Sequence, residues 1–172
     1  RDVNFKKFID LQLYNAKKEA EIMKTIKSFS KISDKTSLKV QSQYEENPYP
    51  RWIRASVGQK TNYIEYIKQQ IHPSPIINPK QKANHPKVLV AGCGTGRHTL
   101  YTATSIKGDI TSIDISKASL AYAKREMEKR DITDIDFIHG DILDVSNINI
   151  NYDIIESIGV LHHMKNPEKG LE

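Results

Sequence analysis

The chain has 172 residues, of which 38% are hydrophobic and 27% are charged, and its formal net charge is +5. That length allows one domain with a sizeable core, or a domain with an appendage. No apolar stretch approaches the roughly 18–20 residues of a membrane span, no signal peptide opens the chain, and a single cysteine excludes an internal disulfide framework, so we expect a cytoplasmic protein. The small basic excess does not indicate a nucleic-acid-binding surface.

The first half of the chain has the spacing of helices. Apolar residues recur at steps of three and four, which predicts helices over 3–14, 15–29, 34–43 and 59–71. We expect most of these apolar residues to pack. Asp34 can cap the third helix, and Asn47-Pro48-Tyr49-Pro50 ends it, because each proline disfavours helix at the residue before it. Residues 72–85 contain three prolines and no period, so we expect a loop or linker.

From residue 87 the pattern changes to strands that alternate with helices. The expected strands are 87–91, 109–114, 134–139 and 152–158, and the expected helices are 97–107 and 116–130. Such alternation implies right-handed crossovers and a parallel sheet covered on both faces, in which ligands bind outside the carboxyl ends of the strands.

Residues 88–96, Val-Leu-Val-Ala-Gly-Cys-Gly-Thr-Gly, form the most informative segment. A buried strand there turns through a glycine loop, which lets a cofactor lie against the backbone. A dinucleotide fold needs its third glycine one place later, where this chain has Arg97. We interpret Cys93, inside the loop, as a small space-filling residue and not as a nucleophile.

Polar residues stand where the other strands end. Asp114 closes the second strand, 18 positions beyond Gly96, where a carboxylate can accept hydrogen bonds from the hydroxyls of a ribose. Asp141 follows the third strand and can accept from an adenine amino group, with Ile142 covering the ring; an ordinary turn aspartate is the alternative.

These segments resemble, in order and spacing, the motifs of class I S-adenosylmethionine-dependent methyltransferases. The resemblance covers residues 87–170 and rests on the glycine loop, Asp114, Gly-Asp-Ile-Leu-Asp at 140–144 and Gly-Val-Leu-His-His at 159–163. It assigns the methionine part of the cofactor to Ala91, Gly92, Gly94, Gly96 and Ser157, the ribose and adenine to Asp114 and Ile115, and the adenine to Asp141 and Ile142.

The resemblance also implies a fold and a reaction. The fold is a Rossmann-like parallel sheet with strand order 3-2-1-4-5-7-6, of which this chain supplies about four strands. The cofactor is S-adenosyl-L-methionine, which an acceptor attacks in line at the sulfonium methyl, with S-adenosyl-L-homocysteine as product. A general base helps only where the nucleophile is protonated. Glu156 and His163 are candidates for that base by position only.

Both ends of the sequence look cut, so we expect a fragment. Its expected parts are a helical linker or appendage over 1–43, a cap helix and proline-rich loop over 44–86, and the N-terminal half of the methyltransferase domain over 87–172. Residues 43–52 resemble a segment that precedes this domain in bacterial tetratricopeptide-repeat methyltransferases; no such repeat is visible here. We expect cofactor binding with weak or absent transfer, and an open edge on the strand over 152–158 that favours self-association.

Several alternatives stay open. A cap over the cofactor and substrate is one role for Tyr44, Tyr49, Arg51, Trp52 and His163. For the first four of these residues, a hydrophobic clasp is the alternative. The methyl acceptor is a small molecule, a protein or an RNA, in that order of preference. A non-catalytic cofactor-binding scaffold and an NAD-dependent oxidoreductase are the competing functions. No metal site is expected, because His162 and His163 are adjacent and no further ligand lies at zinc spacing.

Overall fold

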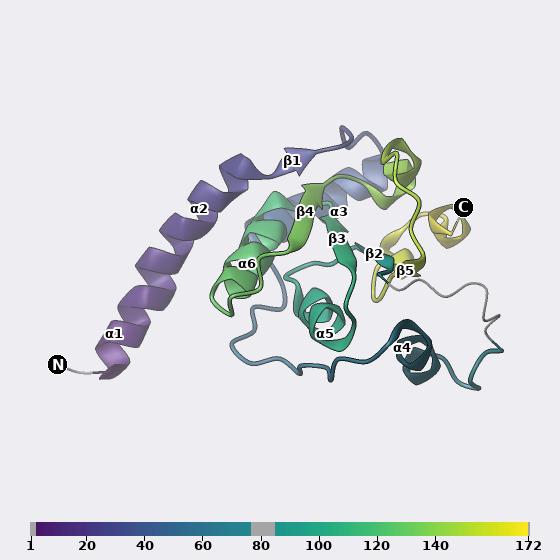
Figure 1. The fold of residues 1–172 in the computed structure, drawn as a ribbon. Coiled ribbons are helices and arrows are strands. Elements are labelled where there is room, and N and C mark those ends of the chain that lie inside the picture. Colours follow the sequence, from purple (N-terminus) through teal and green to yellow (C-terminus); the bar gives the residue numbers. More distant parts are fainter. Residues whose placement is uncertain (1–2, 77–84, 172) are drawn as a thin grey trace.

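The computed structural model describes residues 3–76 and 85–171, and it shows a parallel sheet with helices packed against it (Figure 1). The described strands pair in the order β1-β4-β3-β2-β5, all in parallel. They are β1 (Lys27–Ser28), β2 (Lys87–Ala91), β3 (Asp109–Asp114), β4 (Ile135–His139) and β5 (Ile154–Glu156). The predicted α/β fold with a parallel sheet is confirmed, and β4-β3-β2-β5 reproduces the order 3-2-1-4 that the resemblance implies.

The helices of the described residues lie before and between these strands. They are α1 (Val3–Ile9), α2 (Asn15–Thr25), α3 (Lys35–Glu46), α4 (Tyr63–Gln70), α5 (Arg97–Ser105) and α6 (Lys117–Glu128), with a π-helical turn over Asp10–Tyr14 between α1 and α2. Short 3-10 helices span Ile142–Asn147, Leu161–His163 and Pro167–Gly170. No helix in the part of the chain that the structure describes is long and apolar enough to cross a membrane.

β2 lies between β3 and β5, and this position explains its uninterrupted apolar run. Val88 faces the larger hydrophobic cluster, which it shares with Leu100 of α5 and Leu120 of α6. Leu89 faces the opposite side and packs with Ile113 in a second, smaller cluster. A strand that is covered on both faces needs apolar residues at every position and not at alternate ones.

The first two predicted helices differ from those observed. The helix expected over 15–29 ends at Thr25, because Lys27 and Ser28 form the edge strand β1 beside β4, and the Phe29 N–H donates to the His139 carbonyl at 3.0 Å. Backbone hydrogen bonds to a sheet edge thus override the helical spacing. The apolar side chains of Phe5 and Phe8, on α1, are 63% and 58% exposed, so the packing expected there is absent from the described residues.

Later boundaries follow their capping residues. Asp34 caps α3 by accepting from the Thr36 and Ser37 N–H groups at 2.8 and 2.9 Å, as predicted. The helix expected from residue 59 begins only at Tyr63, because Asn62 caps it. The strand predicted over 152–158 shortens to Ile154–Glu156, and the linker predicted over 72–85 lies partly outside the described residues.

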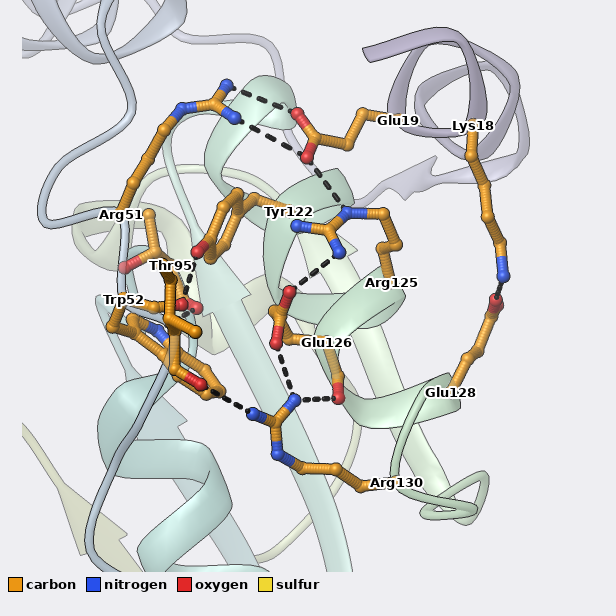
Figure 2. Close-up of polar contacts among 11 residues, drawn as sticks. Lys18, Glu19, Arg51, Trp52, Thr95, Tyr122, Arg125, Glu126, Glu128 and Arg130 are labelled. Atoms are coloured by element: carbon orange, nitrogen blue, oxygen red, sulfur yellow. Dashed lines mark hydrogen bonds and ion pairs between the residues drawn. The ribbon is translucent and has the colours of Figure 1, made fainter. Parts of the chain in front are cut away.

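A buried ionic network fastens α2 to α6 (Figure 2). Glu19 on α2 is 6% exposed and accepts from Arg125 of α6 at 2.9 Å and from Arg51 at 3.1 Å. Arg125 is itself 4% exposed and also pairs with Glu126 at 2.6 Å. The helical N-terminal segment is therefore joined to the sheet domain through the buried charges of Glu19, Arg125 and Glu126, with the half-exposed Arg51 at their edge.

β5 forms one edge of the sheet among the described residues, because it pairs with β2 alone. Ile155, at its middle, is 64% exposed. Such an edge presents unpaired backbone groups to solvent. The expected self-association through this strand stays a prediction.

We expect Glu19→Ala to lower the free energy of unfolding by about 3 kcal/mol, because it leaves the buried Arg125 guanidinium with one carboxylate in place of two. Lys18→Ala, which removes the exposed pair with Glu128 on the same helix, is the matched control and should cost about 0–1 kcal/mol. Urea unfolding followed by circular dichroism measures both. Equal losses in the two variants would contradict the proposed role of the buried network.

Candidate functional site

A cavity of about 550 Å³ opens at the carboxyl ends of β2, β3, β4 and β5. Each of these strands contributes residues at or shortly after its end, and α3 closes one side through Ser37, Val40 and Tyr44. Ligand cavities typically measure about 300–1,000 Å³. The residues brought together here are those that the sequence places after each strand, as expected for a parallel sheet.

The glycine loop between β2 and α5 depends on backbone conformations that favour glycine. Gly92, Gly94 and Gly96 have φ angles of +76°, +52° and +80°. A Cβ on Gly92 would lie 2.2 Å from a methyl of Val160, and one on Gly96 would lie 2.6 Å from the Cβ of Ala123. At Gly94 the nearest atom to such a Cβ is the Tyr49 carbonyl oxygen, 3.9 Å away, so this glycine leaves open space on the cavity side.

Asp114 joins the end of β3 to that loop. Its Oδ2 accepts from the Gly94 N–H at 2.7 Å, and its Oδ1 accepts from the Ser116 N–H at 2.9 Å. The side chain lines the cavity although the residue is only 9% exposed. Burial raises the pKa of Asp114 to about 6, against the opposing effect of the hydrogen bonds from Ser116 and Gly94.

Asp141 lies at the cavity wall and begins the 3-10 helix after β4. One of its carboxylate oxygens accepts from the Leu143 N–H at 3.1 Å, which is the turn role considered as an alternative. Its own N–H donates to the Ser30 hydroxyl at 3.2 Å. The apolar side chains of Ile115 and Ile142 line the same cavity. The turn bond uses one oxygen of Asp141, so it does not exclude a role in binding.

The segment after β5 reaches the cavity through Ile158, Gly159 and Val160. Ser157 is not part of the cavity lining, and its buried Oγ has no hydrogen-bond partner within the ranges 3–76 and 85–171. The structure therefore does not bring Ser157 to the cavity with most of the other predicted cofactor-binding residues.

The residues predicted to form a cap or a clasp separate into two groups in the structure. Tyr44, Tyr49 and His163 line the cavity, and the Tyr44 hydroxyl lies 3.5 Å from His163 Nε2. Arg51 and Trp52 do not line it. Trp52 is buried, donates from Nε1 to the Thr95 carbonyl at 2.9 Å and accepts at its own carbonyl from the Tyr122 hydroxyl, while Arg51 pairs with Glu19 (Figure 2).

A family model described as a methyltransferase domain matches residues 88–171. This part of the chain is similar to that family. Among curated proteins, the methyltransferase domain is similar to an uncharacterised protein of Synechococcus, with 40% identity over 88 residues that cover 50% of this chain and 21% of that protein. A (S)-tetrahydroprotoberberine N-methyltransferase of Eschscholzia californica is 35% identical over 46% of this chain and 23% of its own length. Rat arsenite methyltransferase is 27% identical over an alignment that covers 91% of this chain and 45% of that protein.

Solved structures agree on the fold. The [4+2]-cyclase SpnF matches with a TM-score of 0.53 and 18% identity. The match covers 83% of this chain and 56% of SpnF. EvdMO1 has a TM-score of 0.51 and 17% identity over 83% of this chain and 33% of its own. The chain spans 21–45% of the length of the curated relatives above and two further plant N-methyltransferases.

The sequence did not predict the contacts of two carboxylates that brace the methyltransferase domain. Glu45, on α3, accepts from the Lys117 and Ala118 N–H groups at 2.7 and 3.0 Å, and so caps α6 from another helix. Glu156, at the end of β5, is held by Tyr66, His98 and Thr102. Sequence spacing signalled neither set of contacts, because the partners of Glu45 are 72–73 positions away and those of Glu156 are 54–90 positions away.

The structure does not support Glu156 as the general base, the role that its position suggested. Glu156 does not line the cavity, and its hydrogen bonds from His98, Tyr66 and Thr102 outweigh burial and keep its pKa below the usual range, which makes it a poor proton acceptor. Among residues 3–76 and 85–171, no group of three or more His, Cys, Asp or Glu side chains could hold a metal ion.

We expect Trp52→Phe to lower the free energy of unfolding by about 1–3 kcal/mol, because the buried Thr95 carbonyl in the glycine loop loses its donor. Tyr49→Phe, in the same segment, is the matched control: Tyr49 is 72% exposed, so the change should stay within about 0.5 kcal/mol. Chemical denaturation compares the two. A Trp52→Phe protein as stable as the wild type would refute the clasp.

Proposed function

We propose that this chain binds S-adenosyl-L-methionine as part of a methyltransferase that acts on a small molecule or a protein. The observation that carries the proposal is the junction of Gly94 and Asp114 at the floor of one cavity, with the hydrogen bond between them at 2.7 Å. When bound, this cofactor supplies an electrophilic methyl group on a sulfonium and is released as S-adenosyl-L-homocysteine.

The residues present are compatible with that cofactor. Gly94 has no side chain where a ligand would approach the backbone, and Asp114 offers a carboxylate at the same place. We infer that Asp114 accepts from the ribose hydroxyls, with Ile115 against the nucleoside. Asp141 and Ile142 would accept from the adenine amino group and cover its ring. The glycine loop, whose Gly92 and Gly94 line the cavity, would hold the methionine end.

The acceptor side of the cavity favours a small molecule or a protein side chain over RNA. Its wall there consists of Tyr44, Tyr49 and His163, which suit an apolar or aromatic group. Arg51, two positions after Tyr49, is paired with Glu19 (Figure 2), and Arg97 is the one lysine or arginine among the described lining residues. RNA binding uses several cations beside the site.

The relatives leave the acceptor open. Their names include an (S)-tetrahydroprotoberberine N-methyltransferase and an arsenite methyltransferase, which differ in the acceptor that they name. We propose cofactor binding with weak or absent transfer for this chain, because it spans less than half of each of the curated relatives. A cytoplasmic location fits the lone buried thiol of Cys93.

Isothermal titration with S-adenosyl-L-homocysteine tests the proposal. We expect micromolar binding by the wild type and a loss of at least tenfold in Asp114→Ala, whose folding is checked by circular dichroism. NAD should not compete for the site. Displacement of S-adenosyl-L-homocysteine by NAD would support an oxidoreductase instead, and an absence of binding would overturn the proposal for this chain.

The affinity for S-adenosyl-L-homocysteine should fall as the pH is lowered. The pKa of Asp114 in the free protein is raised to about 6, so the carboxylate that accepts from ribose hydroxyls is protonated below that pH. We expect a constant dissociation constant above about pH 7 and a rise toward tenfold per pH unit below 6. Asp114→Asn should bind weakly with no such slope, and an identical slope in this variant would assign the effect to another group.

A further inference from the structure

A polar cluster lies directly beside the cavity, at the end of β5. Glu156 Oε2 is 2.9 Å from His98 Nε2 and accepts from the Thr102 hydroxyl at 2.7 Å, while its Oε1 accepts from the Tyr66 hydroxyl. The Glu156 and His98 side chains are 10% and 22% exposed, and Tyr66 is fully buried. Three separate elements, β5, α5 and α4, therefore converge on one carboxylate.

The cluster determines which nitrogen of His98 carries hydrogen. Both oxygens of Glu156 accept hydrogen bonds, and these bonds keep the carboxyl ionised by lowering its pKa against the effect of burial. An ionised carboxylate cannot donate, so His98 Nε2 must donate to it. In a neutral imidazole the proton on Nε2 leaves Nδ1 as an acceptor, and no partner for Nδ1 is found among the described residues.

His98 is the member of this cluster that reaches the cavity. It lies in the first turn of α5, directly after the glycine loop, and it lines the cavity together with its neighbours Arg97 and Tyr101. Glu156, Tyr66 and Thr102 do not line it. Tyr66 and Thr102 already tie α4 and α5 to Glu156, so the sheet is held together without the histidine.

We propose that His98 is the general base toward the methyl acceptor and that Glu156 is its positioning residue. This inference rests on the proposed function and adds the acceptor class: a group that still carries its proton at neutral pH, an alcohol or phenol O–H or a thiol S–H. The proton leaves the acceptor for Nδ1 of His98, the imidazolium is balanced by the negative charge of Glu156, and the proton later passes to water.

Nuclear magnetic resonance of protein labelled with ¹⁵N-histidine tests this assignment without turnover. We expect the spectrum to show hydrogen on His98 Nε2, the nitrogen that faces Glu156. With S-adenosyl-L-homocysteine bound, phenol should shift the Nδ1 resonance through an O–H···N bond, and anisole, which has no O–H, should not. Glu156→Gln should give a mixture of the two tautomers, because a neutral amide can donate as well as accept, while S-adenosyl-L-homocysteine affinity changes less than twofold.

Each outcome separates this proposal from the one on which it rests. Hydrogen on Nδ1, or equal responses to phenol and anisole, would overturn the role of His98 even if S-adenosyl-L-homocysteine binds. An absence of S-adenosyl-L-homocysteine binding would overturn the proposed function, whatever the tautomer. His98→Gln should remove the resonance that responds to phenol. His162→Gln, which changes a histidine next to His163 and outside the cavity lining, should keep that response.

Discussion

The hydrogen bond from the Gly94 N–H to the Asp114 carboxylate fixes the geometry on which the site depends. It joins the loop after β2 to the end of β3, and the Gly92 and Cys93 N–H groups add to it by donating to the Ile113 carbonyl at 2.9 Å. The loop can approach this closely only because its glycines adopt positive φ angles. The cavity floor is thus a backbone surface with one buried carboxylate, which suits a polar ligand that lies along the chain.

The segment between α2 and α4 acts both as a brace and as a wall. Trp52 holds the glycine loop through Thr95, and Glu45 caps α6, so two elements of the methyltransferase domain are fixed by residues that precede it in sequence. Tyr44 and Tyr49 extend from the same stretch into the cavity lining. A change in how this segment packs would therefore alter both stability and the shape of the proposed acceptor side.

Structural likeness alone leaves the reaction open, because a protein named as a [4+2]-cyclase shares this fold at a TM-score of 0.53. The reaction has to be argued from the site. Here the proposed cofactor side rests on Gly94 and Asp114, whereas the proposed acceptor side rests on aromatic residues and on the His98–Glu156 pair. The two pairs share no residue, so they can be altered separately by mutation.

The sequence by itself determined the parallel sheet, the glycine loop and the acidic residues after the strands, because the periodicity of apolar residues and the spacing of glycines are local properties. It could not determine that residues 27–28 pair as a strand, that Trp52 is a clasp while Tyr49 lines the cavity, or that His98 meets Glu156. Those features arise from contacts between residues tens of positions apart. Only the folded chain decides them, since burial and the geometry of hydrogen bonds depend on which elements the sheet brings side by side.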